Sequence, residues 1–256
     1  MIGSSVSLII PAYNEENTIR DVINSTAGVM DSLGLPYEII VINDGSTDNT
    51  EMAALSTGYK IKYFSNETNR GKGYSLRRGV QHAKGDIIIT LDSDGEHKPK
   101  EIPSLLTPLF EGTEVVSGSR FLGNGYHGVT SKINQIGNYL FNLAIMILTG
   151  NYISDSQTGF RAMRKEVFEK LNLQSDGFEI ETEITVKSLI SGFRFKEVPI
   201  TVERRKHSAS KIKIISDGRK ILRTIIRSSI SSFEPFRMTE FSSDAETKTV
   251  ELQMVK

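Results

Sequence analysis

Two aspartates that directly follow a predicted strand are the residues of this sequence best placed to do chemistry. The run at 87–91 is short, apolar and rich in β-branched residues, as in a strand covered on both faces of a parallel sheet. It ends at Asp92-Ser93-Asp94, and a core cannot take up two unpartnered carboxylates, so both must emerge at the carboxyl end of the strand. With Glu96 two residues further on, the spacing suits a hard divalent cation that also binds diphosphate oxygens. The plainer alternative is an acidic surface turn.

Polar clusters follow two other predicted strands in the same way. One is Tyr13-Asn14-Glu15, after the run at 6–10, and the other is the NDGSTD cluster at 43–48, after the run at 38–42. Because ligands of open α/β sheets bind at the carboxyl ends of the strands, we expect one shared crevice. In it Glu15 and Asp44 could accept hydrogen bonds from a ribose or a base. Arg70 and Lys72, which are set among glycines, could approach phosphates.

The elements that must position these residues alternate between strand and helix. Apolar runs predict strands at 6–10, 38–42, 60–64, 87–91, 114–117 and 194–202, with Arg120 close to the end of the fifth. Helical spacing predicts helices that end near residues 33, 55, 83 and 109, the first of them capped by Asn14 or Asn17. Pro11 lacks the N–H of a ladder, so we expect the first strand to end there or to lie at an edge. Continuous apolar runs favour an α/β fold with a mostly parallel sheet and helices on both faces.

Motif spacing, composition and charge exclude several classes of protein. The glycines match neither a Walker P-loop nor the G-x-G-x-x-G fingerprint, which argues against a nicotinamide or flavin enzyme. The 256 residues are 38% hydrophobic and 24% charged, as in a soluble globular protein with a substantial core. Thirty-one acidic and 31 basic residues cancel, so bulk charge indicates no nucleic-acid partner. The sequence contains no cysteine, which excludes disulfides and thiolate catalysis and suits a reducing compartment. We expect neither a secretory signal nor a membrane span.

The second half of the chain contains one apolar and one basic helix candidate. Residues 132–149 include the run LFNLAIMIL, which predicts a buried helix or, alternatively, contact with a membrane surface. Residues 204–227 hold nine Lys or Arg and one acid, with Lys220, Arg223 and Arg227 at helical spacing, so they predict a basic amphipathic helix for a membrane surface or an acidic ligand. Between these segments, residues 154–161 suggest a polar turn. Residues 177–184 alternate acidic and apolar side chains and could open a helix whose glutamates are solvated.

Seven motifs occur in an order that resembles a known family. They are PAYNEE, INDGSTDNT, NRGKGYSLRRG, ITLDSDGEH, GSR, TGFRAMRKEVF and R-x-H-S-x-S-K, and they span about residues 5–215. Together they resemble the family 2 glycosyltransferases, and within these the dolichyl- (polyprenyl-) phosphate mannosyltransferase and glucosyltransferase group. The resemblance implies a GT-A fold, a nucleotide-sugar transferase domain at 1–235 that includes a basic membrane-surface segment at about 204–233, and a polar tail at 236–256.

The resemblance also implies roles for individual residues. Asp92 and Asp94 would bind Mg²⁺ or Mn²⁺ on the diphosphate, with Glu96 where the family often has a third ligand, commonly glutamine. Arg120 would face the acceptor phosphate. The matches that would hold the base and ribose are Pro11, Tyr13, Glu15 and Asp44, and those that would neutralise the phosphates are Arg205 and Lys211. Asn43 stands where many members have aspartate, and the transmembrane helices that follow this domain in many members are not in this sequence.

The reaction that we predict is an inverting, metal-dependent transfer of a sugar to a polyprenyl phosphate. The donor is a nucleoside-diphosphate sugar, either GDP-mannose or a UDP-hexose. We expect the enzyme to be peripheral to the cytoplasmic face of a membrane, with or without a small membrane subunit. A phosphate acceptor is already an oxyanion and needs no strong base. A sugar hydroxyl acceptor would need one, for which Asp155, Glu179 and Glu181 are candidates. We therefore expect Asp92→Ala to abolish turnover and Glu181→Gln to preserve it. The rival from another class is a non-catalytic nucleotide-sugar-binding subunit of a membrane complex.

Overall fold

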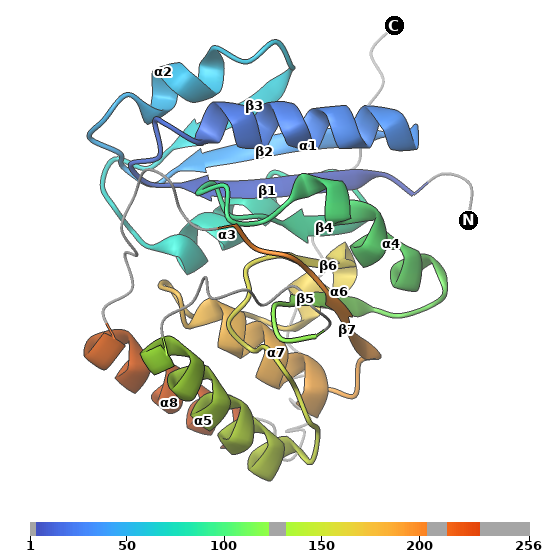
Figure 1. Ribbon diagram of the computed structural model, residues 1–256, viewed down its shortest axis with the longest axis vertical. Coiled ribbons are helices and arrows are strands. Elements are labelled where there is room, and N and C mark those ends of the chain that lie inside the picture. Colours follow the sequence, from blue (N-terminus) through green and yellow to red (C-terminus); the bar gives the residue numbers. More distant parts are fainter. Residues whose placement is uncertain (1–3, 123–131, 204–213, 231–256) are drawn as a thin grey trace, which may run out of the picture.

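The computed structural model describes residues 4–122, 132–203 and 214–230. Within these ranges, seven strands form one sheet, and helices fill most of the connections between them (Figure 1). The strands are β1 (Val6–Ala12), β2 (Tyr37–Asn43), β3 (Ile61–Ser65), β4 (Ile87–Thr90), β5 (Val115–Ser119), β6 (Arg161–Arg164) and β7 (Phe195–Pro199). The helices are α1 (Ile19–Leu33), α2 (Thr50–Leu55), α3 (Lys72–Gln81), the 3₁₀ turn η1 (Pro99–Glu101), α4 (Ile102–Phe110), α5 (Lys132–Thr149), α6 (Lys165–Lys170), α7 (Ile180–Ile190) and α8 (Ile214–Ile230).

The sheet has the order β3-β2-β1-β4-β6-β5-β7 and is mostly parallel. Only β6 runs antiparallel to its neighbours β4 and β5, while the other pairs are parallel. The predicted α/β class with a mostly parallel sheet is therefore confirmed. Strand β6 was not predicted, because the preceding polar residues indicated a turn. The predicted tail at 236–256 lies outside the described residues.

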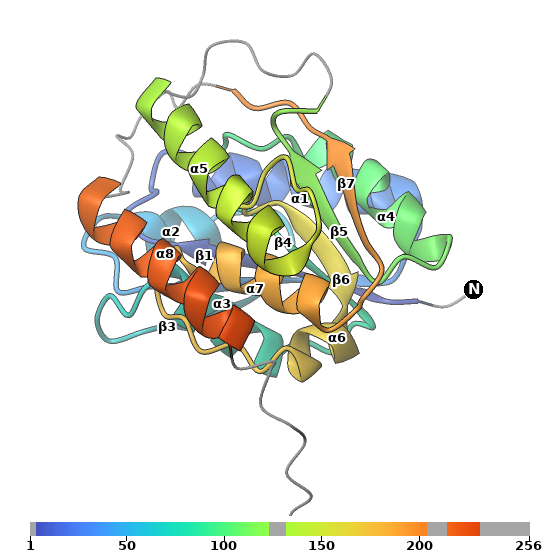
Figure 2. The same ribbon diagram turned by 90° about the horizontal axis from the view of Figure 1, so that it is seen from below.

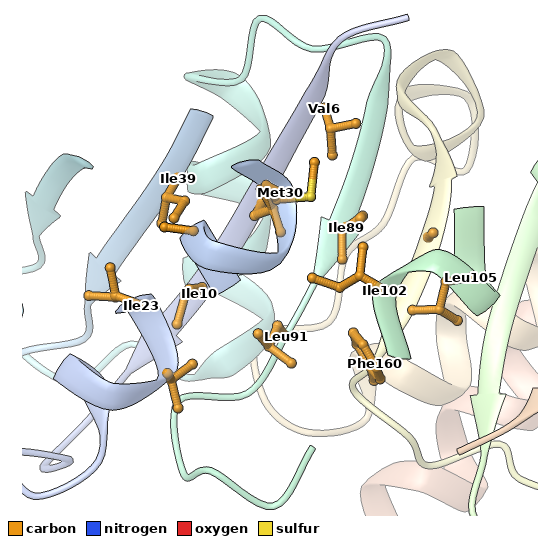
Figure 3. Close-up of a cluster of buried hydrophobic side chains, with 14 of the residues drawn as sticks. Val6, Ile10, Ile23, Met30, Ile39, Ile89, Leu91, Ile102, Leu105 and Phe160 are labelled. Carbon is orange, nitrogen blue, oxygen red and sulfur yellow. The ribbon is translucent and has the colours of Figure 1, made fainter. Parts of the chain in front are cut away.

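Helices cover both faces of the sheet. On one face, α1 and α4 pack over the central strands, and Figure 3 shows Ile23 and Met30 of α1 together with Ile102 and Leu105 around Ile10 and Ile89. On the other face, α3, α6 and α7 pack over the opposite side chains of the same strands, such as Ile9 and Ile88. Every residue of β1 and β4 is buried, which is why their sequences are continuous apolar runs.

Helices α5 and α8 lie side by side on the outer side of α7, further from the sheet (Figures 1 and 2). Ile145 of α5, Val186 of α7, and Ile221 and Ile225 of α8 form a small core between them. The prediction that α5 is a buried helix is wrong, because much of its apolar surface faces outward. Seven apolar or aromatic side chains of α5 are exposed: Ile136, Tyr139, Leu140, Leu143, Met146, Ile147 and Leu148.

Three local predictions are corrected by the packing. Strand β1 continues through Pro11 in the middle of the sheet, which is possible because its pairing with β4 stops at Ile9 and Thr90. Helix α1 follows Thr18, so neither predicted asparagine caps it, and Asn14 instead accepts a hydrogen bond from the Thr47 N–H. Glu181 and Glu183 of α7 are buried rather than solvated.

Truncation of Ile89 should test the importance of the core under β4. Its side chain is fully buried, so we expect Ile89→Ala to lower the free energy of unfolding by about 2–5 kcal/mol, through lost burial and the cavity that remains. Urea unfolding followed by circular dichroism measures this change. The matched control is Ile147→Ala on α5, where the side chain is 72% exposed and the change should stay within about 0.5 kcal/mol. Equal losses in the two variants would contradict the assigned packing.

Candidate active site

A crevice of about 530 Å³ lies at the carboxyl ends of β1, β2 and β4. Seven of the residues singled out in the sequence line it together, and Asn69, Gly71, Ser93 and Phe178 contribute further surface. These seven are Pro11, Tyr13, Glu15, Asp44, Lys72, Asp92 and Asp94. The predicted shared crevice is therefore present, and it gathers residues from four segments of the first half of the chain and Phe178 from the second half. Arg205 and Lys211 lie outside the described residues.

The turn that carries the two aspartates is fixed from both sides. The Ser93 hydroxyl donates to the Pro11 carbonyl at the end of β1 (2.9 Å). The Thr18 hydroxyl, at the start of α1, donates to the Ser93 carbonyl (2.8 Å). The Asp94 carboxylate accepts a hydrogen bond from the Glu96 N–H (3.0 Å). The two carboxylates are thus held by the backbone that surrounds Ser93.

Four charged side chains of alternating sign form a row that begins in the core and ends in the crevice. Arg161 Nε lies 3.1 Å from Glu181 Oε2, Glu181 Oε1 lies 2.9 Å from Lys72 Nζ, and Lys72 Nζ lies 2.5 Å from Asp92 Oδ1. Side-chain exposure is 0% at Arg161, 3% at Glu181, 10% at Lys72 and 24% at Asp92. The Glu181 contacts are ion pairs without the directional geometry of hydrogen bonds. Burial lowers the pKa of Lys72, but the charges of Asp92 and Glu181 outweigh burial and raise the pKa overall, so the ammonium stays protonated.

Gly159 allows this row to reach the crevice. A methyl carbon at this position would lie 2.5 and 2.8 Å from the two carboxylate oxygens of Asp92, and it would also meet the Lys72 ammonium. Any side chain here would therefore displace the Lys72–Asp92 ion pair. Gly159 belongs to the TGFR motif, to which the sequence alone assigned no geometry.

Asp44 organises the segment that carries Lys72 in addition to lining the crevice. Its carboxylate accepts hydrogen bonds from the backbone N–H groups of Arg70 (2.9 Å) and Gly71 (2.8 Å) and from the Asn66 side chain (2.6 Å). Gly71 has a φ of 98°, a conformation that favours glycine, and α3 starts directly after it. A buried aspartate at the end of β2 thus sets the position from which Lys72 enters the crevice.

Arg120 is held at the end of β5 by a buried carboxylate. Its Nε and Nη2 donate to the two oxygens of Asp155 at 2.7 and 2.9 Å, and Asp155 is fully buried. Burial raises the pKa of Asp155, but the charge and hydrogen bonds of Arg120 outweigh burial and lower the pKa below its ordinary value. Burial lowers the pKa of Arg120, but the charge and hydrogen bonds of Asp155 outweigh burial and raise the pKa overall. The negative charges of Glu96 and Asp92 add smaller contributions in the same direction. Asp155 occupies two of the five guanidinium N–H donors, which leaves three for a ligand.

The donor set fits a divalent cation that shares its coordination with a ligand. In the described part of the chain, no group of three or more His, Asp or Glu side chains is arranged to hold a metal ion by itself. Asp92 and Asp94 both line the crevice, so two hard carboxylate donors face the space where a ligand would bind. Glu96 does not line the crevice. The pair therefore fits a cation that completes its shell with diphosphate oxygens and water rather than a closed protein cage.

The sequence did not reveal the buried partners of the predicted residues. Residues 154–161, predicted as a polar turn, include Asp155 and Arg161, both fully buried. Arg161 donates to the carbonyls of Ser156 and Thr158 and to the Thr185 hydroxyl, which explains how a cation is tolerated there. In the sequence, the one signal of these buried partners was Arg161 itself, a basic residue within the TGFRAMRKEVF motif.

Comparison with known proteins identifies similar sequences and folds. The model of the family described as Glycosyl transferase family 2 matches residues 7–172. An uncharacterized protein of Methanocaldococcus jannaschii is 32% identical over 88% of this chain and 92% of its own length. Dolichol-phosphate mannosyltransferase of Pyrococcus furiosus is 32% identical over 81% of this chain, which spans 59% of that enzyme. One solved structure with the same fold is glucosyl-3-phosphoglycerate synthase from Mycobacterium tuberculosis, crystallised with Mn²⁺, UDP and phosphoglyceric acid. It superposes with a TM-score of 0.68 and is 24% identical, over 90% of this chain and 78% of that one.

Replacement of Asp155 should test the buried pair with Arg120. We expect Asp155→Asn to lower the free energy of unfolding by about 3–5 kcal/mol at pH 7, because it leaves a mostly buried guanidinium without its counter-charge. The folded-state pKa of Asp155 is lowered, so its contribution is fully present above the unfolded pKa of about 3.9 and is lost as pH falls through the folded value. The difference between wild type and variant, measured by urea unfolding, should therefore shrink at low pH.

The control for this experiment is Asp176→Asn. Asp176 pairs with Arg77, but its side chain is 61% exposed, so the loss should stay below about 1 kcal/mol. A loss of similar size in both variants, or one independent of pH in Asp155→Asn, would contradict the assigned pair.

Proposed function

The chain belongs to glycosyl transferase family 2, and we propose that it transfers a sugar from a nucleoside-diphosphate sugar to a polyprenyl phosphate, with a divalent cation bound to the diphosphate. The observation that carries this proposal is the grouping of the Asp92 and Asp94 carboxylates with the Lys72 ammonium in one crevice. Arg120 does not line this crevice, but it lies close enough to Asp92 for the two charges to interact. The name of the Pyrococcus furiosus relative supports the acceptor class, and the UDP and Mn²⁺ of the Mycobacterium tuberculosis structure support the donor class and the cation.

The donor would lie along the carboxyl ends of β1, β2 and β4. We propose that Pro11, Tyr13, Glu15 and Asp44 contact the base and ribose, since they line the same crevice as the two aspartates. Lys72 would bind the diphosphate, because its ammonium already lies beside Asp92. A cation held by Asp92 and Asp94, with or without Glu96, would stabilise the negative charge that develops on the departing diphosphate. Arg205 and Lys211 would add positive charge.

The acceptor would bind through Arg120. A phosphate oxygen of the acceptor would form a bond to the anomeric carbon of the donor sugar. The bond from that carbon to the diphosphate oxygen would break at the same time, and the nucleoside diphosphate would leave as an anion. No proton has to be removed, because the acceptor is ionised near neutral pH. Asp155 keeps the guanidinium oriented through two donors and leaves three for the phosphate.

The candidate bases for a sugar hydroxyl acceptor are poorly placed. Both oxygens of Asp155 are held by Arg120, which lowers the pKa of Asp155 and weakens it as a base. Glu181 is enclosed between Lys72 and Arg161. Glu179 does not line the crevice but an adjoining groove along α7 and α8, which shares Asn69 and Gly71 with it. This arrangement favours the phosphate acceptor. It also removes the basis for expecting unchanged turnover in Glu181→Gln, since that substitution disturbs the crevice whatever the acceptor.

The outer helices provide a surface for the membrane that would contain the acceptor. No helix in the described ranges combines the length and apolar character needed to cross a bilayer. Helix α5 exposes apolar side chains, and Leu222 and Ile226 are exposed on the neighbouring helix α8, as are the cations Arg219, Arg223 and Arg227. Apolar side chains flanked by cations suit the interface of an anionic membrane. We propose that α5 and α8 dock there.

A turnover screen tests the proposed reaction. GDP- and UDP-sugars are incubated with a short polyprenyl phosphate and Mn²⁺ or chelator, and lipid products are detected by mass spectrometry. We expect a chelator-sensitive lipid-linked sugar, and Asp92→Asn should reduce the rate by at least about a hundredfold, because charge stabilisation at the diphosphate is lost. Glu51→Gln, an exposed change on α2, should leave the rate unchanged. Transfer only to sugar hydroxyls would replace the proposed acceptor, and metal-dependent donor binding without turnover on any acceptor would indicate a non-catalytic subunit.

Vesicle sedimentation tests the docking surface. We expect binding to vesicles that contain anionic lipid, weaker binding to zwitterionic vesicles, and partial release at high salt. Ile147→Asp on the exposed face of α5 should reduce binding several-fold, whereas Met52→Asp, an equally exposed apolar position on α2, should not. If vesicle binding does not change with lipid charge, with salt or with either substitution, this docking surface is ruled out.

A further inference from the structure

The Lys72 ammonium lies where it must influence any cation bound by Asp92. Its Nζ is 2.5 Å from Asp92 Oδ1, and only 10% of its side chain is exposed. A divalent cation on the same carboxylate would therefore lie within a few ångströms of a fixed positive charge, and the two would repel each other. Glu181 opposes this effect, because it attracts the ammonium from the other side at 2.9 Å.

We propose that Lys72 and Glu181 together set the metal affinity of Asp92, with Lys72 as an internal cation that competes for the carboxylate and Glu181 as the positioning residue that draws Lys72 away from it. This inference rests on the proposed function, in that Asp92 is taken to bind the cation. It assigns opposite effects to two neighbouring residues.

The row of charges explains why Glu181 can play this part. Glu181 is anchored by Arg161, which cannot move because it also donates to two carbonyls and a hydroxyl. Lys72 is therefore shared between a fixed anion in the core and Asp92, which is more exposed. A diphosphate in the crevice would give the ammonium a third anionic partner and relieve the competition. Metal and diphosphate should therefore bind cooperatively.

The test measures Mn²⁺ affinity by electron paramagnetic resonance, without donor sugar and without turnover. Lys72→Met keeps an unbranched side chain, one atom shorter, and removes its charge, so we expect Mn²⁺ to bind about tenfold more tightly. Glu181→Gln leaves the ammonium to Asp92 alone, so we expect about tenfold weaker binding. Lys62→Met, which removes a lysine paired with Glu38, should leave the affinity unchanged, and Asp92→Asn should abolish the site.

A double-mutant cycle separates positioning from a general electrostatic effect. If Glu181 acts through Lys72, Glu181→Gln should change Mn²⁺ affinity by less than about threefold once Lys72→Met is present. A second readout is the gain in Mn²⁺ affinity on addition of GDP or UDP, which should be smaller in Lys72→Met than in wild type. If Glu181 had only a structural role, Glu181→Gln would cause the same loss of Mn²⁺ affinity in the wild type and in Lys72→Met.

The outcomes distinguish this inference from the proposed function. If wild type binds Mn²⁺ and Asp92→Asn does not, but Lys72→Met fails to tighten binding, the inference is overturned and the metal site stands. If wild type binds Mn²⁺ no better than Asp92→Asn, both without nucleotide and in the presence of GDP or UDP, the metal site itself is wrong and the inference falls with it. Should Glu181→Gln not fold, as judged by circular dichroism, the Lys72→Met result decides alone.

Discussion

The burial of Arg161 is the constraint on which the active-site crevice depends. A fully buried guanidinium must be neutralised, and Glu181 of α7 supplies the charge. Glu181 in turn pairs with Lys72 of α3, and Lys72 pairs with Asp92 after β4. One row of ion pairs therefore links β6, α7, α3 and the aspartate turn, and the charge balance of the core orients the side chains that we propose for catalysis.

Parallel strands account for the position of the crevice, and hydrogen bonds account for its precision. The carboxyl ends of β1, β2 and β4 bring their following turns to one edge of the sheet. Each turn is then tied to a neighbour: Ser93 to Pro11, Thr18 to Ser93, and Asp44 to the backbone at Arg70 and Gly71. These contacts restrict the side chains that would meet a diphosphate, which reduces the entropy lost on binding.

The residues proposed to bind the donor and those proposed to bind the acceptor come from different parts of the chain. The proposed donor side consists mainly of turns of the first half, whereas Arg120 is held by Asp155, whose backbone N–H donates to the Glu197 carboxylate of β7 at 2.9 Å. Helices α5 and α8 bury Ile145, Ile221 and Ile225 in the small core with α7 and leave most of their other described apolar side chains exposed. Their exposed apolar side chains, together with the cations of α8, suit the membrane interface that we propose for this half of the protein.

The sequence alone determined the α/β class, most of the strand and helix boundaries of the first half, and the residues that line the crevice, because buried parallel strands and the turns after them have a distinctive pattern. Only the tertiary structure decided that Arg161, Glu181 and Asp155 are buried partners of predicted site residues. A polar run looks the same in sequence whether water or an opposite charge satisfies it, so β6 and the glutamates of α7 could not be predicted. For the same reason, the apolar run of α5 indicated burial, although its outward face is covered by no other described element.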